Sequence, residues 1–474
     1  MERKFGVLLP IFSLYGEYGI GTFGKPAYEF VDFLTDCGAD FWQVLPLCPV
    51  GHGASPYSSP CGDAINPYFI DFDVLIQKGL LTKSECEPIK SENSLRVDYN
   101  ALENRMDLLK KAFSRFGGKV SGYKEYALYM ALKEANCGAP WYEWGECAYS
   151  GSNAVKEFYN NHIDEVRFWQ FVQDEALNEW LELKSYANSK GIEIIGDMPF
   201  YVAHDSVEVW QNKSLFKLDG FIPKVVAGVP PDYFSATGQL WGNPVYAWHN
   251  KVYAWWNKRI KGALRLFDRL RLDHFRAFDE YYEIPYGSED ATNGVWQKGP
   301  GFDFFKDKKD LPIIAEDLGI ITDSVRKLLA QTGYPGMRVV QFGFDGNPNN
   351  PHLPTNITNN CVCYTGTHDN MPLKQFFASL GEREYSIVKQ FLSEECGQEV
   401  SDDIDELIDT VIELGCMTDA KLFIVPIMDL MHSGDRINEP GTVSKLNWSI
   451  RISKDDLDGL KEHINNLIKK YNRI

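Results

Sequence analysis

Continuous apolar runs recur along the chain without the polar alternation that marks a strand with one exposed face. They lie at residues 6–10, 41–47, 192–199, 270–275, 313–318, 337–344, 361–367 and 422–430. Strands buried on both faces, as in a parallel sheet covered by helices, have this pattern. Helix-like segments, such as residues 28–37 and 322–332, separate several of the runs. We therefore predict an α/β fold in which residues 1–474 form a single (β/α)₈ TIM barrel.

Two of the intervals between predicted strands are too long for simple crossovers. The first predicts a largely helical insertion at residues 48–190, which ends in an amphipathic run at 155–190. The second predicts an insertion at residues 200–268, rich in Gly, Pro and aromatic residues. Insertions of this kind enlarge many single barrels, so we expect one barrel with additions rather than several domains.

Composition and charge exclude several kinds of partner. Acidic residues outnumber basic ones by 66 to 48, a net charge of −18, which predicts no binding to nucleic acid or to an anionic membrane. No apolar run approaches the roughly 18 residues of a membrane span, and Pro10 and Glu17 argue against a signal peptide. The ten cysteines include no CxxC pair, which predicts reduced thiols and a cytoplasmic location.

A glycine motif at residues 19–24, Gly-Ile-Gly-Thr-Phe-Gly, matches the dinucleotide-binding pattern GxGxxG. That pattern must follow a strand and must be completed by a ribose-binding acid at the end of the next strand. Residues 44–47, Val-Leu-Pro-Leu, supply no such acid. We therefore interpret the motif as a tight loop and expect no nucleotide cofactor.

Three carboxylates, Asp273, Glu316 and Asp369, stand at or just beyond the ends of predicted strands. Because the carboxyl ends of parallel barrel strands open onto one face, these acids are expected to converge. Two carboxyl groups roughly 5 to 5.5 Å apart are the minimum for glycoside chemistry with retention of configuration. Neighbouring strands lie about 4.8 Å apart, which suits Asp273 and Glu316. Salt-bridged acids with only a structural role are the alternative.

The neighbours of these acids suggest how each would be tuned. Arg271 lies two residues before Asp273 and shares its face of the strand, so we expect it to hold the pKa of Asp273 low. Glu316 would need a pKa raised by burial and by negative charge, some of it from Asp369. His274 and His368 adjoin aspartates and raise the alternative of a metal site. The chain has only nine histidines, and no HxH pair stands at the end of the first strand. We therefore expect no catalytic metal.

Residues 228–244 form a Gly- and Pro-framed segment that carries several aromatic residues. Aromatic rings stack on the C–H faces of sugars, and a loop over the barrel mouth can act as an active-site lid. The alternative is that these aromatics only pack the insertion onto the barrel. The residue pattern alone leaves several functions open. The protein could be a hydrolase, a metal-dependent barrel hydrolase or a catalytically silent glucan-binding protein.

Six sequence blocks resemble the amylomaltases, the 4-alpha-glucanotransferases or disproportionating enzymes of the alpha-amylase superfamily. They occur in the family's order at residues 55–60, 196–206, 228–244, 271–276, 315–319 and 365–370. The resemblance implies transfer of a segment of an alpha-1,4-glucan or maltooligosaccharide to the 4-hydroxyl of a glucose or maltodextrin acceptor. It also implies retention of configuration through a covalent glycosyl-enzyme intermediate, without a cofactor or a metal.

The resemblance also implies roles for individual residues. Asp273 matches the nucleophile, Glu316 the acid/base and Asp369 a carboxylate that binds and distorts the donor sugar. Substrate-binding positions of the family match Tyr57, Asp197, Tyr233, Phe234, Trp241, Arg271 and His368. Residues 436–442 keep the family's Arg-x-Asn-x-Pro-Gly-Thr core, but the stretch 430–436 departs from the usual Leu- and Gly-rich sequence. We expect this departure to affect acceptor length preference and loop closure, and to leave the carboxylates untouched.

Overall fold

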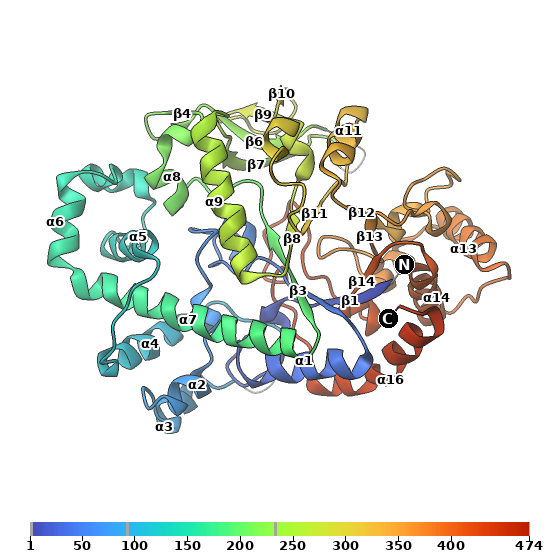
Figure 1. Ribbon diagram of the computed structural model, residues 1–474, viewed down its shortest axis with the longest axis horizontal. Helices are drawn as coiled ribbons and strands as arrows, with labels where there is room; N and C mark the ends of the chain where they lie inside the picture. Colours follow the sequence, from blue (N-terminus) through green and yellow to red (C-terminus); the bar gives the residue numbers. More distant parts are fainter. Residues whose placement is uncertain (1–2, 92–93, 232–234, 474) are drawn as a thin grey trace.

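A sheet of eight parallel strands lies at the centre of the molecule (Figure 1). The computed structural model describes residues 3–91, 94–231 and 235–473. The strands follow the order β11-β8-β3-β2-β1-β14-β13-β12, and a hydrogen bond from the Ala315 N–H to the Pro335 oxygen joins the two edges at 2.9 Å. The strand bounds are β1 (Lys4–Leu8), β2 (Phe41–Gln43), β3 (Glu193–Met198), β8 (Arg269–Leu272), β11 (Ile313–Ala315), β12 (Gly336–Val339), β13 (Cys361–Tyr364) and β14 (Leu422–Pro426). Each predicted apolar run overlaps one of them, which confirms the barrel.

Helices surround the barrel and connect its strands (Figure 1). Of the two helices predicted between strands, one is α1 and the other is α11, which Thr322 caps through its side chain and Gly333 ends in the left-handed conformation. Among the described residues, no helix is both long enough and apolar enough to cross a membrane. Apart from a short helix at residues 207–211 and the helices between β2 and β3, the α-helices of the described residues are α1 (Lys25–Cys37), α9 (Asn250–Leu266), α10 (Phe302–Phe305), α11 (Asp323–Thr332), α12 (Leu373–Ser379), α13 (Glu382–Cys396), α14 (Ile404–Met417), α15 (Ile427–Leu430) and α16 (Lys454–Tyr471).

Helices fill the long interval between β2 and β3 and form the left side of the molecule in Figure 1. The amphipathic run predicted at residues 155–190 is two helices, which meet at His162. The helices of this interval are α2 (Phe72–Gln77), α3 (Lys83–Cys86), α4 (Asn104–Arg115), α5 (Lys124–Ala135), α6 (Asn153–Asn161) and α7 (Ile163–Ser189).

A second, antiparallel sheet lies at the top of Figure 1, with strand order β10-β9-β6-β7. It joins two parts of the chain, because β6 and β7 precede β8 whereas β9 and β10 follow it. None of these four strands is among the eight predicted, and polar residues interrupt β7, β9 and β10, unlike the continuous apolar runs of the barrel strands. The elements of this region are α8 (Val207–Gln211), β4 (Leu218–Asp219), β5 (Ile222–Pro223), β6 (Val225–Val229), β7 (Gln239–Pro244), β9 (Glu280–Pro285) and β10 (Val295–Lys298).

Close packing explains the glycine motif at residues 19–24. A Cβ atom on Gly21 would lie 1.8 Å from the backbone oxygen of Ile11, and one on Gly24 would lie 1.9 Å from Oδ2 of Asp71. Any larger side chain at either position would therefore collide with its neighbours. These glycines are therefore required by the close packing of the loop. This agrees with our interpretation of the motif as a tight loop.

Candidate active site

Asp273 and Glu316 follow directly on two neighbouring barrel strands. β8 and β11 pair in parallel with Leu272 opposite Ala315, and the Glu316 N–H donates to the Leu272 oxygen at 3.0 Å. The next residue on each chain is therefore Asp273 on one side and Glu316 on the other. Strands at this spacing, about 4.8 Å, suit two carboxyl groups that act on one glycosidic bond. The prediction that adjacent strands carry these two acids is confirmed.

Arg271 joins Asp273 to a second, deeply buried carboxylate. Its Nη2 lies 3.0 Å from Oδ1 of Asp273, and its Nη1 lies 2.8 Å from both oxygens of Asp197. The side chain of Asp197 is fully buried at the end of β3, and that of Arg271 is nearly so. One guanidinium thus faces two acids, and the prediction that Arg271 and Asp273 share a face is confirmed.

Tyr57 and His368 extend this network to the third acid. The Tyr57 hydroxyl donates to Oδ2 of Asp197 at 2.6 Å and lies 2.9 Å from Nε2 of His368. Because its one proton goes to Asp197, the hydroxyl must accept from His368, whose Nε2 therefore carries a hydrogen. That nitrogen is also 3.4 Å from Oδ2 of Asp369. Burial lowers the pKa of His368, which favours the neutral ring.

Residues near the C-terminus hold Asp369 from the other side. Asn438 Nδ2 donates to Oδ1 of Asp369 at 2.6 Å, and Arg436 Nη2 donates to its backbone oxygen at 2.7 Å. Within the stretch 430–436, Arg436 thus reaches the backbone of Asp369, whereas its carboxylate is bound by Asn438 of the retained core. The Arg-x-Asn core was visible in the sequence, but only the fold shows that it contacts Asp369. Trp448, also missed, packs against Tyr57 at 5.6 Å between ring centroids.

Two backbone N–H groups bind the Glu316 carboxylate, and an exposed tryptophan packs against one of the donating residues. The two carboxylate oxygens accept from the N–H groups of His274 at 2.7 Å and Leu318 at 2.9 Å. His274 has a positive φ of 49°, which aims its N–H at the acid. Trp241 on β7 meets the His274 ring edge-on at 4.9 Å and is 38% exposed, so its indole is available next to a residue that binds Glu316. Tyr233 and Phe234 lie outside the described residues.

Burial is the largest influence on the pKa of Asp273 and on that of Glu316. It raises the pKa of Asp273 to about 7 and that of Glu316 to about 8, although Arg271 lowers both. The prediction of a low pKa for Asp273 is wrong, because loss of solvation outweighs the guanidinium. The predicted rise in the pKa of Glu316 is confirmed. The negative charge that adds to the effect of burial on Glu316 is that of Asp273, whereas the charge of Asp369 raises the pKa of Asp273.

Replacing Arg271 with methionine is expected to destabilise the fold by about 3–5 kcal/mol, because it leaves the buried Asp197 without its cation. Arg269→Met is a matched control on the same strand, since Arg269 pairs with Glu193 at a half-exposed site and should contribute about 1 kcal/mol or less. Urea unfolding of both variants measures the difference. Equal free energies of unfolding would contradict the importance of this buried pair.

Comparison with known proteins gives consistent results over the whole chain. A family model described as 4-alpha-glucanotransferase matches residues 9–457. The 4-alpha-glucanotransferase of Clostridium butyricum is 41% identical, with 98% of this chain and 99% of that protein covered. That of Aquifex aeolicus is 42% identical, with 99% of each covered. The solved structure of amylomaltase from Streptococcus agalactiae in complex with acarbose has a TM-score of 0.93 at 36% identity and covers 100% of both chains.

Proposed function

The chain belongs to the 4-alpha-glucanotransferase family, and from this premise we propose that Asp273 is the nucleophile and Glu316 the acid/base of glucan transfer. The enzyme moves a segment of an alpha-1,4-glucan to an acceptor sugar. The observation that carries the assignment is the pairing of β8 with β11, which makes the two acids cross-strand neighbours. The buried Arg271 at 3.0 Å from Asp273 supports it.

In the first step Asp273 attacks the anomeric carbon of the donor sugar while the bond to the leaving glucan breaks. Arg271 holds Oδ1, so Oδ2 is the oxygen that forms the new bond. Glu316 gives its proton to the departing 4-oxygen. In the second step Glu316 takes a proton from the acceptor's 4-hydroxyl, that oxygen attacks the anomeric carbon, and Asp273 is released. Two inversions give retention of configuration.

The surrounding residues would bind the sugars on either side of the cleaved bond. Asp369 presents a carboxylate that suits the hydroxyls of the donor sugar, and His368, held by Tyr57 and Asp197, lies beside it and positions it. Trp241 offers an exposed indole for stacking on a sugar face. We assign residues 228–244 the role of a lid, with Tyr233 and Phe234 on the acceptor side.

Incubation of the purified protein with maltotriose tests the function. We expect glucose together with a ladder of longer maltooligosaccharides, because a bound sugar hydroxyl positioned for attack outcompetes water. Glucose and maltose alone would mean a hydrolase. No change would mean a glucan-binding protein, and loss of activity with a chelator that a divalent ion restores would mean a metal-dependent enzyme.

The pKa values of the two acids predict a narrow pH optimum for kcat/KM. Asp273 must be ionised to attack, so activity is lost as the pH falls through about 7. Glu316 must be protonated to act as the acid, so activity is lost as the pH rises through about 8. Initial rates at low maltotriose concentration across this range measure the profile. A flat profile through both values would contradict the assignment.

We also propose that the protein works in a reducing compartment such as the cytoplasm. The support is that all ten cysteines are unpaired and seven of them are buried. Structural disulfides are typical of proteins that work in oxidising compartments.

A further inference from the structure

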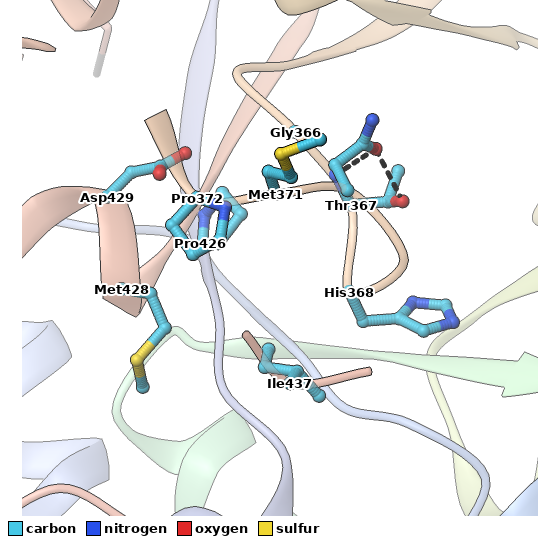
Figure 2. Close-up of a pocket in the computed structure, with 10 residues that line it drawn as sticks. Gly366, Thr367, His368, Met371, Pro372, Pro426, Met428, Asp429 and Ile437 are labelled. Carbon is cyan, nitrogen blue, oxygen red and sulfur yellow. Dashed lines mark hydrogen bonds between the residues drawn. The ribbon is translucent and has the colours of Figure 1, made fainter. Parts of the chain in front are cut away.

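The segment that holds Asp369 begins at the end of α15 and runs over residues 431–438. Asp429 at its base accepts hydrogen bonds from the Thr365 hydroxyl at 2.6 Å and the Leu373 N–H at 2.7 Å. Those two residues are the ends of the loop that carries His368 and Asp369. Figure 2 shows Asp429 on one side of the small cavity between them and His368 on the other. The 431–438 segment and the Asp369 loop therefore form one connected unit.

His432 in this segment combines a left-handed backbone conformation with contacts to two carboxylates. Its φ of 50° lies in the left-handed region, which Gly adopts most readily and which Asn, Asp and His adopt more often than other residues. Its Nε2 lies 2.9 Å from Oδ1 of Asp409, and its Nδ1 lies 3.8 Å from Oδ1 of Asp405. An imidazole offers a donor to carboxylates on both sides only when it is protonated. The geometry therefore fits the charged ring.

The charges around His432 come from four helices. Asp405 and Asp409 lie on α14, and Asp405 also pairs with Lys374 of α12 at 3.0 Å. His463 of α16 lies 3.6 Å from Asp409, and Asp429 lies on α15. The hydrogen bond to Asp409 raises the pKa of His432 despite partial burial and Lys374.

We propose that His432 is a positioning residue whose charged form ties the 431–438 segment to α14 and so holds Arg436 and Asn438 against Asp369. This inference rests on the proposed role of Asp369 in binding the donor sugar. The contacts of charged His432 with Asp409 and Asp405 raise its pKa, so they stabilise the segment at low pH. This stabilisation is lost as the pH rises through the pKa of His432. Neutral His432 keeps one donor, and Asp435 remains paired with Arg96, so the loss is partial.

The variant His432→Asn tests this proposal, because asparagine tolerates the left-handed conformation but carries no charge. We expect its kcat/KM for maltotriose to be about three- to five-fold below wild type near pH 6, and this difference to narrow as the pH rises and His432 loses its charge. Taking the ratio at each pH removes the titration of Asp273 and Glu316. His463→Asn is the matched control: it changes a histidine beside the same Asp409 outside the segment, and its ratio should stay near one.

Amide hydrogen exchange of residues 431–441 near pH 6 gives a reading that does not depend on activity. Exchange should be faster in His432→Asn than in wild type and unchanged in His463→Asn. A ratio of kcat/KM that does not vary with pH, or equal exchange in His432→Asn and wild type, would overturn the proposal. If instead Asp369→Asn transfers glucan like wild type, the proposed role of Asp369 fails, while the exchange data still judge whether His432 anchors the segment.

Discussion

Asp273→Asn is expected to lower kcat for maltotriose disproportionation roughly ten-thousand-fold or more, because an amide of the same shape cannot act as the nucleophile. The fold should persist. Arg271 keeps its bonds to Asp197 in this variant, and the Asp273 N–H still donates to the Met198 oxygen at 3.2 Å. Initial-rate measurements with unfolding curves for the same preparation separate loss of chemistry from loss of structure.

Asp303→Asn serves as the control for this experiment, since Asp303 is exposed on α10 and pairs only with Lys306 among the ion pairs of the described residues. It should retain the wild-type rate. Turnover by Asp273→Asn within about ten-fold of wild type would exclude the nucleophile role, because removing a covalent nucleophile costs far more than that.

Glu316→Gln is expected to lower kcat for maltotriose about a hundred- to ten-thousand-fold through loss of the proton donor. Its amide oxygen can still accept from His274, whereas its NH₂ group cannot accept from Leu318, so one of the two bonds to this side chain is lost. A donor with a fluoride leaving group, such as alpha-maltosyl fluoride, needs no proton from the enzyme. The first step should then be largely restored.

The comparison between the two donors is what tests the acid role. Wild type and Glu316→Gln should release fluoride at similar rates in a first turnover, although they differ strongly with maltotriose. An equal loss with both donors would mean that Glu316 acts by supporting the structure rather than by giving a proton.

The sequence was most informative where one local pattern determines the structure. The barrel strands are apolar on both faces, so each stands out as a continuous run, and parallel strands deliver the acids at their ends to a common edge. From this pattern we predicted that Asp273, Glu316 and Asp369 lie on one side of the barrel. Spacing along one strand likewise predicted that Arg271 faces Asp273.

Features that depend on distant parts of the chain were not predictable in this way. Asn438 reaches Asp369 across 69 residues of sequence, and no periodicity connects them. The pKa of Asp273 was misjudged because the sequence shows the neighbouring arginine but not the loss of water around the acid. The antiparallel sheet was missed because its strands come from separate parts of the chain: β9 pairs with β6, which precedes β8, and β10 pairs with β9.

The most direct test of the covalent mechanism is to locate the trapped sugar. Glu316→Gln treated with alpha-maltosyl fluoride should accumulate the glycosyl-enzyme, because the second step lacks its base. Mass spectrometry of a protease digest should then find the added maltosyl group on the peptide that contains Asp273. A sugar attached to any other peptide, or none while fluoride is released, would contradict the account.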